Sequence, residues 1–125
     1  MDEESDPLTG AVIGAAIEVH RFMGPGLIES VYQRCLCHEL EIRGIPHRSQ
    51  VKLPIHYKGL DLGNDLVVDV IVDDRLILEL KSVERVLGIH EAQLLTYLRL
   101  SGIELGLLMN FNVKYLKDGI MRRIL

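Results

Sequence analysis

The chain has 125 residues, 48% of them hydrophobic, which fits one domain with a single core and argues against an intrinsically disordered protein. Its 18 acidic and 14 basic residues give a formal net charge of −4, which by itself does not favour a nucleic-acid partner. No apolar run approaches the roughly 20 residues that span a membrane, so we expect no membrane partner. We expect residues 1–125 to form a single domain. Residues 1–6, which are acidic and lack a secretory h-region, are expected to be a flexible N-terminus.

The two cysteines, Cys35 and Cys37, lie two residues apart on a predicted helix, where their side chains diverge. A disulfide between them is therefore not expected. Free thiols are typical of the reducing cytoplasm, which is the location that the sequence predicts.

Two helices are predicted at the start of the chain. Asp6 and Pro7 are typical of an N-cap and a first helical position, and Gly24-Pro25-Gly26 ends the helix that they begin. A second helix is expected from about Leu27 to Arg43, with Gly44 as its stop. The apolar stripes expected to face the core are Leu8, Val12, Ala15, Ala16, Val19 and Phe22 in the first helix and Ile28, Val31, Tyr32, Cys35, Leu36 and Leu40 in the second.

After the second helix the apolar period changes from helical to alternating, which indicates strands. Strands are predicted at about 50–57, 66–72, 76–81, 104–111 and 120–125, and a third helix at about 89–100. Pro54 lacks the N–H that a central strand needs, so the first strand is expected at a sheet edge or a bulge. Short turns make the first three strands an antiparallel meander, whereas the link through the third helix makes the third and fourth strands parallel. The sequence therefore predicts an α/β fold with a mixed sheet flanked by helices.

Three ionisable residues interrupt the most apolar hairpin of the chain. Asp69 lies in the middle of one strand, and Glu79 and Lys81 lie at the end of the next. Burying a carboxylate is costly unless a hydrogen bond, an opposite charge or a metal compensates it. A three-residue loop at 73–75 would put Asp69 directly opposite Glu79, whereas a two-residue turn would put them on opposite faces. We predict the first register.

Two carboxylates on one face can chelate a hard cation, so Asp69 and Glu79 are predicted ligands of Mg²⁺ or Mn²⁺. Such a metal lowers the pKa of a bound water and stabilises charge on a phosphoryl oxygen. Lys81 shares a strand face with Glu79 and can hold the attacking water or neutralise the transition state. The alternative is a simple ion pair between Glu79 and Lys81 at a strand end. Asp65 and Glu29 are also expected near this site.

The third predicted helix supplies further candidates. His90, Gln93 and Tyr97 form a polar stripe, in which Gln93 can bind a phosphate or orient a water. The alternatives are a hydrated helix face and, for His90, a capping role. Glu29, in the first turn of the second helix, is favoured there by the helix dipole whatever its function. The apolar stripe of the third helix is Ile89, Ala92, Leu95 and Leu98.

Basic residues gather near the C-terminus, where they stand against the single acid Asp118 and form either a phosphate-facing patch or a solvated edge. They are Lys114, Lys117, Arg122 and Arg123. The remaining histidines have no partner at metal-ligand spacing and are given no role. They are His20, His38, His47 and His56.

Taken together, these motifs resemble the GxxExxY family of the PD-(D/E)XK nuclease superfamily. The name-giving motif matches Gly26-Leu-Ile-Glu29-Ser-Val-Tyr32. Val68-Asp69 and Glu79-Leu80-Lys81 stand where the superfamily has its first carboxylate and its [Asp/Glu]-x-Lys motif. Gln93 to Tyr97 fits the Gln-x-x-x-Tyr pattern of the RecB-like branch. Val68 replaces the proline of the superfamily's name, a position that varies widely.

The resemblance implies a restriction-endonuclease-like fold with an α-β-β-β-α-β core, which agrees with the order of the predicted elements. It also implies hydrolysis of phosphodiester bonds with Mg²⁺ or Mn²⁺ as cofactor. The roles that it implies are metal binding for Asp69, Glu79 and the Leu80 carbonyl, water positioning for Lys81, assistance for Glu29 and Gln93, and substrate contact for Tyr97 and His90.

The sequence leaves two functions open. The first is a metal-dependent nuclease acting on DNA or RNA. The second is a non-catalytic module on the same fold, which binds nucleic acid or protein and acts as a homodimer or with a protein partner. The small size, the acidic balance and the lack of a strong basic groove favour the second.

Overall fold

The computed structural model describes residues 6–125, of which Asn64 is described by its backbone alone. The helices are α1 (Pro7–Met23), α2 (Glu29–Ile42) and α3 (Gly88–Ser101), the short 3₁₀ helix is η2 (Leu116–Gly119), and the strands are β1 (His47–Tyr57), β2 (Leu60–Val72), β3 (Leu76–Lys81), β4 (Leu105–Asn110) and β5 (Ile120–Ile124). Asp6 caps α1 by accepting a hydrogen bond from the Leu8 N–H. The rest of the expected flexible N-terminus lies outside the described residues.

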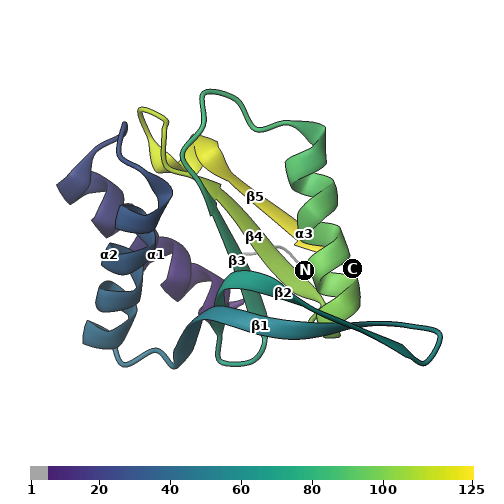
Figure 1. The fold of residues 1–125 in the computed structure, drawn as a ribbon. Helices are drawn as coiled ribbons and strands as arrows, with labels where there is room; N and C mark the ends of the chain where they lie inside the picture. Colours follow the sequence, from purple (N-terminus) through teal and green to yellow (C-terminus); the bar gives the residue numbers. More distant parts are fainter. Residues whose placement is uncertain (1–5) are drawn as a thin grey trace.

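The strands form one mixed sheet that confirms the predicted fold class. Within residues 6–125 the sheet has five strands in the order β1-β2-β3-β4-β5, and β3 pairs with β4 in parallel while the other neighbours are antiparallel. Helices α1 and α2 cover one face and α3 covers the other (Figure 1). Each face carries its own cluster of buried side chains, and the larger cluster lies under α1 and α2. Across residues 6–125, no helix is both long enough and apolar enough to cross a bilayer.

The β1–β2 hairpin is longer than predicted. Its outer part pairs only with itself and projects from the body as an arm (Figure 1). Pro54 lies on the edge strand β1, at a register shift between Pro54 and His56, so both features predicted for it are present. Asp65 pairs with Pro54 on this arm and is exposed, so the expectation that it joins the carboxylate site is wrong.

The turn between β2 and β3 has the predicted register. Val72 pairs with Leu76, which leaves a three-residue loop. Asp73 and Asp74 adopt φ angles of 50° and 52°, a left-handed conformation that Asp tolerates better than most residues. The pairing runs on to Val70 and Leu78, and one residue further the same register places Asp69 opposite Glu79, on one face of the sheet.

The predicted apolar stripe of α3 is wrong in part. Leu94 and Leu98 are buried, whereas Ile89 is 69% exposed and Ala92 faces solvent. The reason lies on β4, where a Cβ on Gly106 would come within 2.8 Å of Leu94 Cδ1 and 3.2 Å of Leu98 Cδ2. The missing side chain leaves a groove for these two leucines, and this groove sets the rotation of the helix.

The predicted stripes of α1 and α2 also include two residues that face solvent. Phe22 is 81% exposed and Ile28 is 69% exposed. Both flank the turn between the two helices, in which Leu27 is the residue that packs against the core. The other residues of these stripes are buried or packed against the core, except Val31.

Candidate functional site

Where β2 and β3 separate, the carboxylates of Asp69 and Glu79 take the place of backbone carbonyls as hydrogen-bond acceptors for the opposite strand. The paired register of these strands ends at Val70 and Leu78. Beyond it, the Asp69 N–H donates to Glu79 Oε2 at 2.9 Å, and the Leu80 N–H donates to Asp69 Oδ2 at 2.9 Å. Each acidic side chain therefore holds the opposite strand, and the two carboxylates are fixed side by side.

The electrostatics of this pair are unfavourable without a cation. Glu79 is 4% exposed, and burial together with the charge of Asp69 raises its pKa to about 8. Burial also raises the pKa of Asp69, opposed by the Leu80 N–H and the charge of Lys81. A glutamic acid with this pKa is largely protonated at neutral pH, so the pair carries less charge than its composition suggests.

Lys81 and Tyr97 lie close to the carboxylate pair. The Lys81 ammonium lowers the pKa of both carboxyl groups, although burial outweighs it. The pKa of Tyr97 is raised by burial and by the charges of Glu79 and Asp69, so its hydroxyl lies within electrostatic reach of the pair from α3. The structure thus brings together residues from two strands and one helix.

The other predicted residues of α3 are placed differently. His90 stands at the start of the helix, where its Nδ1 accepts a hydrogen bond from the Leu87 N–H at 3.0 Å. This contact is the capping role left open by the sequence, and it leaves Nε2 for other partners. Gln93 is partly buried and lies one turn before Tyr97, on the same side of the helix.

Glu29 reaches the site from the other layer of the fold. It begins α2, and its Oε2 accepts a long hydrogen bond of 3.4 Å from the Ser82 N–H, just after β3. Its charge raises the pKa of both Asp69 and Glu79, which shows that it lies within electrostatic reach of them. The Ser82 hydroxyl donates to the Leu27 carbonyl and fixes the α1–α2 turn to the end of β3.

Tyr32 holds that turn in shape. Its hydroxyl donates to the Gly24 carbonyl at 2.5 Å and accepts from the Leu27 N–H at 3.1 Å, while its buried ring stacks on Phe111 with centroids 4.5 Å apart. Gly26 adopts a φ of 95°, which other residues rarely tolerate. Gly26, Glu29 and Tyr32 are therefore one unit that presents a carboxylate to the end of β3.

Replacing Tyr32 with phenylalanine is expected to destabilise the protein by about 1–3 kcal/mol, because two partly buried backbone groups lose their partner while the ring stacking remains. Urea unfolding measures this change. Tyr57→Phe is the matched control, since Tyr57 is 61% exposed. Equal stability of the Tyr32→Phe variant and the wild type would contradict the role assigned to the hydroxyl.

Two residues of the site region were not predicted from the sequence. Gln50 lies on β1 between the pairs Ser49–Val70 and Val51–Val68, opposite Asp69, with a φ of 49°. Its amide donates to Gln33 at 2.7 Å and also helps to lower the pKa of Asp69. Its place depends on the pairing of β1, and no local pattern marks it.

The second is Asn110, which is buried at the end of β4 beside Lys81. Its side chain accepts from the Val83 N–H at 3.1 Å and donates to the Val83 carbonyl at 2.9 Å, and so shapes the loop that follows β3. The only signal in the sequence was a polar residue in an apolar strand.

The donor atoms suit a hard divalent cation, although they do not form a complete cage. Among residues 6–125, no three His, Cys, Asp or Glu side chains converge on one point. The oxygens at hand are the two carboxylates and the carbonyl of Leu80. Because the Leu80 N–H points to Asp69, its carbonyl points to the same side of β3. Mg²⁺ is usually bound by one or two carboxylates and keeps several waters, so this set fits it.

Comparison with known proteins agrees with this geometry. A search of curated proteins and a search of solved structures gave no significant match. A model of the PD-(D/E)XK nuclease superfamily matches residues 6–124, which include every residue of the site described above. The chain therefore belongs to the PD-(D/E)XK nuclease superfamily.

Proposed function

We propose that this protein is a metal-dependent nuclease that hydrolyses phosphodiester bonds of DNA or RNA. The observation that carries the proposal is the pair of carboxylates, Asp69 and Glu79, held side by side through each other's strands with Lys81 beside them. A fold that needed these residues only for stability would gain more from apolar side chains at the same positions. Their placement costs free energy that a bound cation would offset.

The roles follow from the geometry. Asp69, Glu79 and the Leu80 carbonyl are the proposed ligands of Mg²⁺ or Mn²⁺. A cation held there supplies a water of lowered pKa and stabilises charge on the phosphoryl oxygens. Lys81 holds the attacking water or the developing negative charge. The assisting and substrate-contacting residues proposed are Glu29, Gln93, Tyr97 and the free Nε2 of His90.

We also assign the chain to the GxxExxY family within the superfamily. The support is the joint action of Gly26, Glu29 and Tyr32, each of which has a separate physical task in the turn beside the site. The free thiols of Cys35 and Cys37 support the proposed cytoplasmic location.

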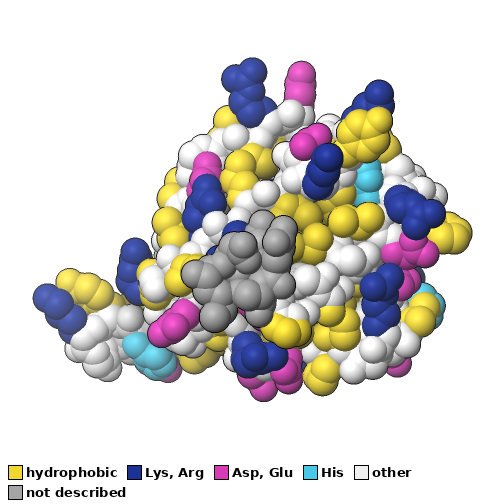
Figure 2. All heavy atoms as spheres, turned by 180° about the vertical axis from the view of Figure 1, so that it is seen from behind, with side chains coloured by type: hydrophobic (Ala, Val, Ile, Leu, Met, Phe, Trp, Pro, Cys, Tyr) yellow, Lys and Arg dark blue, Asp and Glu magenta, His cyan; other side chains and the backbone are white. Residues whose placement is uncertain are grey.

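A second candidate function is a non-catalytic module that binds nucleic acid or protein, alone or as a homodimer. A specific observation favours it: both carboxylates already have backbone partners, and a protonated Glu79 can remain in place without a metal. On the face shown in Figure 2, basic and acidic side chains are interspersed and form no continuous basic track.

Cleavage of labelled single-stranded DNA, duplex DNA and RNA with Mg²⁺, with Mn²⁺ and with EDTA tests the proposal. We expect cleavage with either metal, none with EDTA, and a loss of about a hundredfold or more in the Lys81→Gln variant. Lys52→Gln, on the exposed side of β1, is the control. If no substrate is cleaved with either metal, the second candidate replaces the first.

A further inference from the structure

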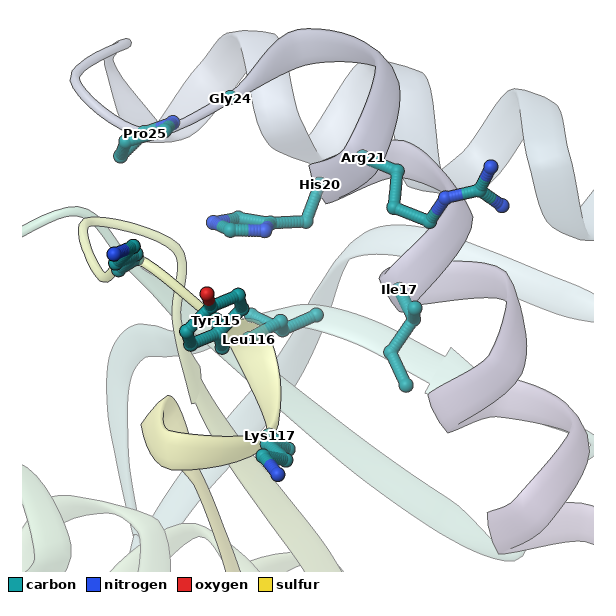
Figure 3. A pocket seen from close by; sticks show the side chains of 9 residues that line it. Ile17, His20, Arg21, Gly24, Pro25, Tyr115, Leu116 and Lys117 are labelled. Atoms are coloured by element: carbon teal, nitrogen blue, oxygen red, sulfur yellow. The ribbon is translucent and has the colours of Figure 1, made fainter.

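A pocket lies at one end of the α1–α2 turn, and Glu29 follows the other end. It has a volume of about 560 Å³ and opens between the end of α1 and the segment that leads into η2 (Figure 3). Gly24 and Pro25 of the α1–α2 turn form part of its wall. None of the proposed nuclease residues lines it, so it is a separate feature of the fold.

The pocket combines an apolar floor with a positively charged rim. Ile17 and Leu116 face each other across it, and Arg21 and Lys117 stand on either side of them (Figure 3). Lys114 is the further basic residue of the lining. None of the described residues in the lining is acidic, but Arg21 is paired with Glu18 just outside it at 2.9 Å, so the uncompensated positive charge comes from Lys114 and Lys117. In a chain with a net charge of −4, such a lining selects an anion with an apolar part.

The walls of the pocket are held in place. His20 is buried, and its Nε2 bonds the Val113 carbonyl at 2.8 Å, which fixes the segment before η2 to α1. Gly119 packs so closely on the carbonyl of Asn110 that a Cβ would overlap it. The side chain of the same Asn110 bonds the backbone of Val83, in the loop after β3.

An aromatic ring is presented at the mouth of the pocket. Tyr115 is 57% exposed, and the Lys114 ammonium lies 5.4 Å from its ring centroid. A flat ring beside exposed cations is the combination by which proteins hold the bases and phosphates of a single strand. The bases of a duplex are stacked on each other and cannot stack on an exposed side-chain ring, so the arrangement favours an unpaired strand.

We propose that this pocket binds one nucleotide of a single polynucleotide strand, away from the bond that is cleaved. The base packs on Tyr115 and the apolar floor, and the phosphate meets Lys114 and Lys117. This inference rests on the proposed nuclease function. The α1–α2 turn has the pocket at one end and Glu29 at the other, and this common turn is what relates the pocket to the carboxylate site.

Binding of a labelled oligothymidylate, measured by fluorescence anisotropy with Ca²⁺ in place of Mg²⁺, tests the proposal without cleavage. The pocket variants are Lys114→Glu with Lys117→Glu, and Tyr115→Ala. The arm offers a matched control, because Lys58 lies 5.3 Å over the exposed ring of Tyr57 and neither residue lines this pocket. The control variants are therefore Lys52→Glu with Lys58→Glu, and Tyr57→Ala.

We expect the pocket variants to weaken binding by about tenfold or more and to lower the salt dependence, while the arm variants change affinity by less than about twofold. An oligonucleotide containing 5-iodouracil is expected to cross-link to Tyr115 on irradiation. The inference would be overturned by equal effects of the pocket and arm variants or by cross-links confined to other residues. It would also be overturned if the wild type preferred a duplex or did not bind the oligonucleotide.

The readout separates this inference from the proposed function. Strand binding that depends on the pocket, in a protein that cleaves nothing, would remove the nuclease proposal and keep the pocket. Cleavage by a protein whose pocket variants bind as well as the wild type would remove only the pocket.

Discussion

Replacing Asp69 with asparagine is expected to lower metal-dependent cleavage by at least about a hundredfold and to leave the fold intact. The amide oxygen of asparagine can still accept the hydrogen bond from the Leu80 N–H, so β2 and β3 stay joined. The variant loses the negative charge that a divalent cation requires. Since the charge of Asp69 also raises the pKa of Glu79, that pKa is expected to fall. Cleavage rates measure the loss of activity, and the melting temperature tests whether the fold is intact.

The matched control for this variant is Asp65→Asn. Asp65 lies on the same strand but on the exposed arm, four residues before Asp69. It is expected to cleave at the rate of the wild type. Undiminished cleavage by the Asp69→Asn variant would remove Asp69 from the proposed metal site. A large fall in melting temperature would instead show that the carboxylate serves the fold.

The register that brings Asp69 to Glu79 was predictable because the strands of the hairpin are close in sequence. A single loop length decides which side chains share a face, and an acidic residue in each apolar run leaves one sensible choice. The parallel pairing of β3 and β4 was predictable for a similar reason, since a helix connects them.

Features that depend on distant partners were not predictable from local pattern. The orientation of α3 is set by Gly106, a residue on another element whose importance is its missing side chain. Gln50 faces Asp69 because of how β1 pairs, 19 positions away in the chain. His20 was given no role, although it fixes the segment that leads to η2 through a contact 93 residues distant. In each case the deciding partner lies in another part of the sequence.

The metal-free protein is expected to lose stability as the pH rises from about 5 to 9, and Glu79→Gln is expected to abolish most of this loss. The pKa of Glu79 is raised from 4.5 to about 8 on folding. Below pH 4.5 the group is protonated in both states and costs nothing. Between the two values the unfolded chain releases a proton that the folded chain keeps, so folding becomes less favourable. Above pH 8 the whole penalty is present, on the order of several kcal/mol.

Other carboxyl groups do not reverse this trend. Asp69 has a raised pKa as well and adds to the loss. Asp6 has a lowered pKa because of its hydrogen bond with Thr9, so its stabilising effect fades only as the pH falls toward and below its usual 3.8. Urea unfolding in EDTA at a series of pH values measures the dependence. Glu84→Gln, at an exposed glutamate, is the control and is expected to follow the wild type. A wild-type stability that stays level up to pH 9 would contradict the prediction.

Repeating these measurements with Mg²⁺ distinguishes the two proposed functions. A cation binds the ionised pair, so its stabilising effect is expected to be larger at pH 8 than at pH 6, and absent in the Glu79→Gln variant. A non-catalytic module would show the same loss of stability with pH but no recovery with Mg²⁺. The free-energy cost of burying the two carboxylates then either serves to hold a metal or is carried by the fold for its shape alone. Whether Mg²⁺ restores stability at pH 8 decides between them.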